Sequence, residues 1–195
     1  MSYEQHGQIR EILGRDADNP IMNFFHVLAR QAAKRGYLVR AATFNAEPMT
    51  IIRFCQWIKQ KQNDTLLVQM HDDLAQVKAS LNKGFEIHDV QHLVAYNFYP
   101  KAKKNSGQLY AIDWQPTHDE RMKLGVSETG YPYRLEDVPV IAKNKHVFNQ
   151  ETGDLIVLNS SYVHGVLVGE DNCRERLVAN GFAALLPNKN IVLFA

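Results

Sequence analysis

Residues 153–168 read Gly-Asp-Leu-Ile-Val-Leu-Asn-Ser-Ser-Tyr-Val-His-Gly-Val-Leu-Val, and this stretch contains two short β-rich runs, 154–159 and 162–168. Turn-forming residues bound the pair at 151–154 and at 169–172. Six further runs are also short and rich in strand-favouring residues: 65–70, 92–99, 108–114, 138–148, 175–185 and 190–194. Many short strands separated by turn signals predict a β-sandwich, a barrel or a jelly roll.

The residues that precede these strands have a different pattern. Residues 19–36 predict a helix, because Asn19 can cap it, Pro20 suits its first turn and Gly36 can end it. We expect a strand at 38–44 and a second helix at 47–61. Helices first and strands later predict an α+β fold. Residues 115–137 show no periodicity, and a connection of that length usually binds something.

Composition excludes several classes of protein. A chain of 195 residues fits a single domain, and 22 Lys+Arg against 21 Asp+Glu give a net charge of +1. We therefore expect no nucleic-acid partner. No apolar run reaches the roughly 18 residues of a membrane span, and the first ten residues lack the apolar core of a signal peptide. Cys55 and Cys173 form no CxxC pattern, which predicts free thiols in the cytoplasm.

A metal site is indicated where the run 65–70 ends, at His71-Asp72-Asp73. A His-x-Asp at a strand end places two ligands on one face, because strand side chains alternate. His164 follows 93 residues after His71 (164 minus 71). Two histidines and one carboxylate on one face are the ligand set of non-haem Fe(II) oxygenases, since three further positions on the metal stay open. Without a metal, these histidines would be a strand cap and an ordinary buried residue.

Two arginines follow His164 at ten and twelve residues. Either Arg174 or Arg176, pointing inward, can hold a carboxylate with two parallel hydrogen bonds. Arg176 sits deeper in the apolar strand and is the preferred candidate, although pattern alone does not choose between them.

The order of these motifs resembles the 2-oxoglutarate/Fe(II)-dependent oxygenases, in particular the branch of amino-acid-derivative hydroxylases and free-amino-acid halogenases. The resemblance covers about residues 66–184 and rests on the segments 71–73, 91–99, 106–109, 114–116, 130–133 and 153–160, followed by His164 and Arg176. It implies a double-stranded β-helix (a jelly roll, cupin-like) with N-terminal helices packed outside. The whole chain would be one oxygenase domain, with an arm at 1–18, a helical part at 19–62 and the jelly-roll core at 64–195.

The resemblance also implies roles for individual residues. His71, Asp73 and His164 would be the iron ligands, Arg176 would bind 2-oxoglutarate, and Asn97 and Tyr99 would line the pocket. With Fe(II), 2-oxoglutarate and O₂, the enzyme would hydroxylate a C–H bond of a small polar substrate, such as an amino acid or its derivative, and release succinate and CO₂. Halogenases carry a small residue at the position of Asp73, so the resemblance implies a hydroxylase. The chain is short at its N-terminus for this branch, so substrate contacts that relatives draw from that region would be either missing or supplied by a second subunit.

Several alternatives stay open. His118 and Glu120 form a His-x-Glu motif, which is an alternative pair of metal ligands. His88 and His92 lie four residues apart and are another. Tyr131, like the aromatic residues Tyr110, Trp114 and Tyr133, fits either a substrate pocket or core packing. The chain as a whole could also be a cupin-type metal enzyme that does not use 2-oxoglutarate, or a non-catalytic β-barrel that binds a ligand. The sequence does not determine whether it forms a homo-oligomer.

Overall fold

The structure, a computed structural model, describes residues 19–56, 65–79, 84–90, 92–127, 129–139, 144–169 and 176–195, without the side chains of residues 79, 88, 89 and 135. The predicted arm 1–18, the end of the predicted second helix (57–61) and Arg174 lie outside the described residues.

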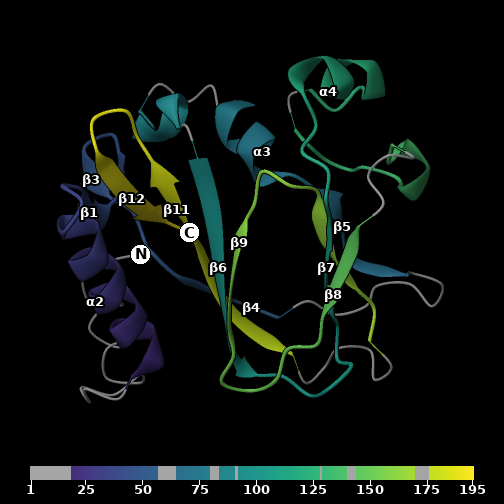
Figure 1. Cartoon of the computed structure of the whole chain (residues 1–195), viewed down its shortest axis with the longest axis horizontal. Coiled ribbons are helices and arrows are strands. Elements are labelled where there is room, and N and C mark those ends of the chain that lie inside the picture. Colours follow the sequence, from purple (N-terminus) through teal and green to yellow (C-terminus); the bar gives the residue numbers. More distant parts are fainter. Residues whose placement is uncertain are drawn as a thin grey trace.

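The fold is α+β and consists mostly of strands (Figure 1). The larger sheet has the order β1-β12-β11-β6-β9, with β4 also paired to β11. Its strands are β1 (Leu38–Ala41), β4 (Arg53–Cys55), β6 (His92–Lys101), β9 (Leu155–Asn159), β11 (Leu177–Leu185) and β12 (Asn190–Phe194). The smaller sheet has the order β5-β10-β7-β8. Its strands are β5 (Leu66–His71), β7 (Leu109–Ile112), β8 (Lys145–Phe148) and β10 (His164–Leu167). Each β-rich run predicted after residue 64 therefore contains a strand.

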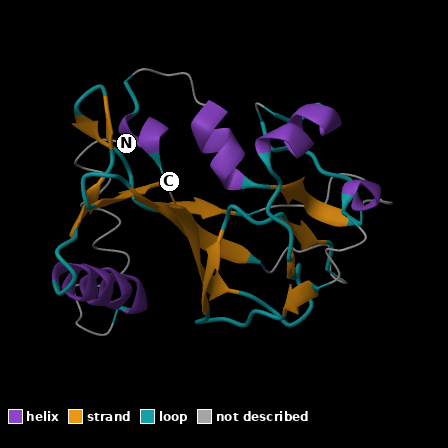
Figure 2. Ribbon diagram, turned by 45° about the horizontal axis from the view of Figure 1, so that its top comes forward, coloured by secondary structure: helices purple, strands orange, loops and turns teal. Residues whose placement is uncertain are grey.

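Helix α2 (Pro20–Ala33) confirms the first predicted helix. The Asn19 side chain accepts hydrogen bonds from the backbone N–H groups of Ile21 and Met22, which caps the helix as expected. Ile21 and Phe25 pack on Tyr96 and other residues of the larger sheet. Figure 2 shows α2 lying along one face of that sheet, away from the smaller sheet. The helix thus covers the outer face of the larger sheet and leaves the inner face to the site.

The predicted second helix at 47–61 is wrong over residues 47–56, the part of it that the structure describes. The chain forms a hairpin of β2 (Thr43–Phe44) and β3 (Glu47–Pro48) and then strand β4. Asn45 and Ala46 adopt positive φ in the hairpin turn. The β-branched pair Ile51-Ile52 leads into β4, whose residues pair with β11. Pairing with β11 outweighs the helix-like spacing of the apolar residues. The β-branched residues favour this outcome because they fit a strand better than a helix.

The segment 115–137 is not an irregular loop throughout. It contains α4 (His118–Leu124) and a short 3₁₀ helix, η2 (Leu135–Asp137). Thr117 and Glu120 form a capping box at the start of α4, and Gly125 ends it with φ of 72°. A helix of seven residues is too short to show a period in the sequence. Two further helical elements are α3 (Asp73–Ala79) and the 3₁₀ helix η1 (Glu86–Asp89).

Three apolar clusters hold these elements together. One joins α2 to the larger sheet, a second joins α3 and η1 to β6, β11 and β12, and a third joins the smaller sheet to the segment around α4. In the described part of the chain, no helix is long and apolar enough to cross a membrane.

Candidate metal centre and cavity

His71, Asp73 and His164 lie together in the structure. His164 on β10 is paired directly with His71 at the end of β5, and their ring centroids are 4.4 Å apart. The Asp73 carboxylate lies between them, with Oδ1 3.4 Å from His71 Nε2 and Oδ2 3.3 Å from His164 Nε2. One ligand atom from each residue lies within 4.8 Å of the others. Among the described residues, this is the one His/Cys/Asp/Glu cluster able to hold a metal ion.

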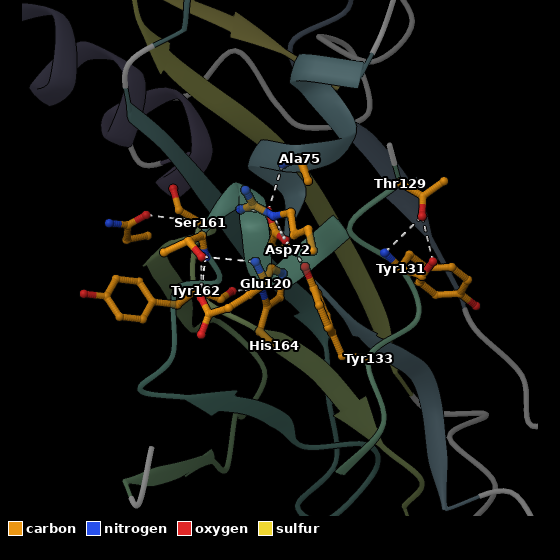
Figure 3. Close-up of polar contacts among 12 residues, drawn as sticks. Asp72, Ala75, Glu120, Thr129, Tyr131, Tyr133, Ser161, Tyr162 and His164 are labelled. Atoms are coloured by element: carbon orange, nitrogen blue, oxygen red, sulfur yellow. Dashed lines mark hydrogen bonds and ion pairs between the residues drawn. The ribbon is translucent and has the colours of Figure 1, made fainter. Parts of the chain in front are cut away.

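The backbone orients both imidazoles in the same way. His71 Nδ1 lies 2.7 Å from the carbonyl oxygen of Gln69. His164 Nδ1 lies 2.8 Å from the carbonyl oxygen of Tyr162, and Figure 3 draws these two residues. A carbonyl accepts only, so each Nδ1 carries the hydrogen and donates it. Both Nε2 atoms then turn toward the Asp73 carboxylate. A second hydrogen bond that fixes ring and tautomer is the usual support of a metal-binding histidine.

Asp73 is placed by the start of α3. The Asp72 side chain accepts a hydrogen bond of 2.8 Å from the backbone N–H of Ala75 and so caps this helix. The backbone N–H of Asp73 donates to the carbonyl oxygen of Ser160, at 2.9 Å, just before β10. The two strands that carry the histidines are thereby tied to the residue between them.

The three side chains influence one another's charge. Burial raises the pKa of Asp73, but hydrogen bonds and charge from His164 and His71 outweigh it and hold the pKa well below its usual range. Burial lowers the pKa of His71, but the hydrogen bond and charge of Asp73 outweigh it and raise the pKa overall. The cluster therefore keeps a carboxylate anion in a largely buried place, where a cation is favoured.

A cavity of about 720 Å³ lies between the two sheets, and the cluster forms part of its wall. Arg176, just before β11, lines the same cavity and is 2% exposed. Its guanidinium lies 5.3 Å from the centre of the Tyr99 ring. Asn97 and Tyr99, on one face of β6, also line the cavity.

Sequence reasoning missed other residues of the cavity wall. Arg53 falls where a helix was expected, and Asn180 is a single polar residue within an apolar strand. Thr129 was also missed and comes from the segment after α4. Tyr131, for which the sequence left a pocket role open, comes from the same segment, and its ring lies 6.3 Å from that of His71. No local signal identified Arg53, because only strand pairing brings it to the cavity.

Asp72 also has a structural role that the sequence did not reveal. This fully buried carboxylate accepts hydrogen bonds from Arg121 Nε and Nη2, both at 3.0 Å, and from the Tyr133 hydroxyl at 2.6 Å (Figure 3). Burial raises the pKa of Tyr133, and the Asp72 carboxylate raises it further. Asp72 therefore connects the metal cluster to α4 and to the cavity wall at 129–133.

Among the described side chains, the alternative ligand pairs do not form a metal-binding cluster. Glu120 is bound to Thr117 in the capping box, and His118 lies at the start of α4. His92 is exposed at the start of β6, and the side chain of His88 is outside the described residues. Of the aromatic residues, Tyr131 lines the cavity, whereas the other three pack in the core of the smaller sheet: Tyr110, Trp114 and Tyr133.

Comparison with known proteins finds amino-acid dioxygenases among the relatives. No protein-family model matches the chain. It is 28% identical over 185 residues to an L-isoleucine 3(1)-dioxygenase of Pantoea ananatis (strain AJ13355), covering 91% of this chain and 57% of that protein. The chain thus spans little more than half of this relative's length.

The structural neighbours carry similar names. An N-substituted L-amino acid dioxygenase of Burkholderia ambifaria AMMD aligns with a TM-score of 0.54 and 11% identity, over all of this chain and 73% of that one. A complex with alpha-ketoglutarate (2-oxoglutarate) under the same protein name aligns with a TM-score of 0.44 and 14% identity, over 76% and 53% of the two chains. The first likeness concerns the fold. With the sequence relative, it confirms the resemblance to the 2-oxoglutarate/Fe(II)-dependent oxygenase superfamily.

Proposed function

We propose that this chain, a homologue of amino-acid dioxygenases, is a non-haem Fe(II)- and 2-oxoglutarate-dependent dioxygenase that hydroxylates a C–H bond of a small polar substrate. The observation that carries the proposal is one shared cavity. Two imidazole Nε2 atoms and a carboxylate lie within 4.8 Å of one another in its wall, and a buried arginine lines the same space. A metal ion and a carboxylic co-substrate can therefore meet there.

The donor set fits Fe(II). Two neutral imidazoles and one carboxylate suit this ion and leave further positions on it open. His71 and His164 keep Nε2 as the acceptor because Nδ1 is engaged by the backbone. Bound Fe(II) with 2-oxoglutarate would supply the oxidation, placing one oxygen atom of O₂ in the substrate and the other in succinate, with loss of CO₂.

Arg176 is our candidate for the distal carboxylate of 2-oxoglutarate. A guanidinium forms two parallel hydrogen bonds to a carboxylate, and burial removes competing water. Arg176 is almost fully buried on the cavity wall and lies beside Tyr99. The Tyr99 ring stabilises the cation and fixes its place. Asn97, two residues earlier on the same face of β6, would line the pocket between co-substrate and substrate.

The strand order supports a jelly-roll core for this single domain. From β4 to β11, successive strands lie in opposite sheets, apart from the neighbours β7 and β8. β4, β11, β6 and β9 follow one another across the larger sheet, and β5, β10, β7 and β8 form the smaller one. Such winding of eight strands between two sheets is a jelly roll, which keeps a cavity between its sheets.

Asp73 favours hydroxylation over halogenation. Its carboxylate occupies the position between the two histidines where a halide would need room. We expect hydroxylated product, and no halogenated product, even when chloride is in excess.

Succinate formation tests the proposal. The protein loaded with Fe(II) should convert 2-oxoglutarate to succinate in an O₂-dependent manner, faster in the presence of amino acids or N-acyl amino acids. His164→Ala should abolish this, whereas His146→Ala, which removes an exposed histidine of β8, should not. Equal succinate formation by wild type and His164→Ala, or none by wild type, would contradict it.

A further inference from the structure

A row of three polar side chains crosses the inner face of the larger sheet. Asn180 on β11 is paired with Asn97 on β6 and, on its other side, with Arg53 on β4. Directly paired residues of neighbouring strands point to the same face. All three line the cavity, so the row Asn97–Asn180–Arg53 is a continuous polar strip across about 10 Å of its wall.

The hydrogen bonds within the row leave donors available. Arg53 Nε donates to Asn180 Oδ1 at 3.2 Å, which orients the guanidinium. Within the described part of the chain, Arg53 Nη1 and Nη2 and the carboxamide of Asn97 have no hydrogen-bond partner in the protein. Arg53 is exposed, whereas Asn180 is 8% exposed, so the strip runs from the mouth of the cavity inward. The outer end of the strip thus offers the two NH₂ groups of a fixed cation.

Arg53 is a different site from Arg176. Asn180, which holds Arg53, lies four residues beyond Arg176, or about 13 Å along an extended chain. One dicarboxylate chelated to the metal and bound to Arg176 does not require a second guanidinium at that distance. A second arginine in the same cavity can therefore hold a second anion.

The charges of the wall lead to the same conclusion. Among the described lining residues, the charged groups are two arginines and Asp73, with both histidines neutral as ligands, so the wall carries +1. Fe(II) and the 2-oxoglutarate dianion cancel each other. Of the charge on the described wall, +1 then remains for the substrate to balance. The described wall offers no carboxylate besides Asp73, the proposed metal ligand, to pair with a substrate ammonium group.

We infer that Arg53, held by Asn180, is the substrate-binding arginine of this cavity and selects a monoanionic carboxylate substrate. The inference rests on the proposed function. The substrate's carboxylate binds Arg53, and an uncharged group that both donates and accepts hydrogen bonds, such as an amide, lies against Asn97. Apolar residues of the cavity wall receive its hydrocarbon part. Ala95 and Phe182 lie on the strands of this row, and Val68, Leu109 and Val166 lie on the smaller sheet. A zwitterion or a neutral molecule of the same shape fits less well.

Three matched probes test the charge selection: N-acetyl-L-leucine (an anion), L-leucine (a zwitterion) and N-acetyl-L-leucinamide (neutral). Binding is measured by calorimetry on the anaerobic protein with Fe(II) and 2-oxoglutarate bound. We expect N-acetyl-L-leucine to bind roughly ten- to a hundredfold more tightly than the other two, as a charged hydrogen-bonded pair implies. Equal affinity for all three, tighter binding of L-leucine, or no binding of any probe would overturn the inference.

Variants assign the effect to Arg53. Arg53→Gln should weaken binding of N-acetyl-L-leucine roughly ten- to a hundredfold and remove its advantage over the amide, and Arg53→Lys should restore part of it. Arg134→Gln, which removes an exposed arginine outside the cavity, is the matched control. Affinity for 2-oxoglutarate, measured on the same samples, should be unchanged in Arg53→Gln. An unchanged affinity of Arg53→Gln for the anion would overturn the inference, whereas failure of the wild type to bind 2-oxoglutarate would contradict the proposed function itself.

Discussion

Arg121 binds both carboxylate oxygens of Asp72, the neighbour of the proposed iron ligand Asp73, through two hydrogen bonds of 3.0 Å. The two adjacent aspartates therefore have different partners. Asp73 faces the histidines, and Asp72 faces α4 and Tyr133. Through this pair, the segment that carries Thr129 and Tyr131 is held against the metal cluster and forms part of the cavity wall.

Removing Arg121 should therefore destabilise the whole fold. Arg121→Met leaves the Asp72 carboxylate buried without its main counter-charge, which costs about 3–5 kcal/mol in the free energy of unfolding. Urea denaturation measures this cost. The matched control is Arg134→Met, because the Arg134–Glu136 pair is exposed, and its change should stay within about 0.5 kcal/mol. Equal stability of the two variants would show that the buried pair is not required.

Metal affinity should fall in acid. Asp73 raises the pKa of His71 in the metal-free protein even though burial lowers it, and a metal binds only the neutral imidazole. Below that raised pKa, a proton competes with the metal, and the dissociation constant should rise by about tenfold per pH unit for each proton displaced. Anaerobic Fe(II) titrations between about pH 5.5 and 8 measure this dependence. An affinity independent of pH would argue against histidine ligands.

The pair Arg40–Glu86 should add a small acid-sensitive part to stability. Arg40 donates to both oxygens of Glu86 at 2.7 and 2.6 Å, and this hydrogen-bonded pair lowers the pKa of Glu86. A lowered pKa in the fold stabilises it above the unfolded-state value of about 4.3, and this contribution is lost as the pH falls through the folded-state pKa.

Glu86→Gln should accordingly lower the free energy of unfolding by no more than about 1 kcal/mol near neutral pH, because the pair is partly exposed. The difference from wild type should shrink toward about pH 3, as both proteins then lack the charge. Urea denaturation at several pH values measures it, with Glu136→Gln as the exposed control. A difference that stays constant down to that pH would show that the charge of Glu86 does not contribute.

Local patterns predicted much of this fold because they depend on neighbouring residues. Asn19 and Pro20 identified α2, and short β-rich runs between turn residues identified the strands of both sheets except β4. The prediction for the stretch around β4 was wrong because the spacing of its apolar residues fits a helix. The strand with which β4 pairs, β11, lies more than a hundred residues away in the sequence. Helix α4 was missed because seven residues show no period.

The residues of the candidate site likewise fall into those that the sequence identified and those that it did not. His71, Asp73 and His164 were identified by residue type and order, and the structure brings them together, although their role as ligands stays a prediction. Arg53 and the Asp72–Arg121 pair depend on register and on contacts distant in sequence. No local pattern contains that information, since a single arginine on a short strand is as often solvated as functional.

The most direct test of the central claim is an anaerobic titration of the metal-free protein with Fe(II) and then 2-oxoglutarate, followed by the weak visible metal-to-ligand charge-transfer band. The band should appear with wild type and with His146→Ala, be lost with His71→Ala, and require more 2-oxoglutarate with Arg176→Ala. Fe(II) binding by the wild type without any band would favour a cupin-type enzyme that does not use 2-oxoglutarate. No Fe(II) binding at all, with the fold intact, would contradict the metal centre itself.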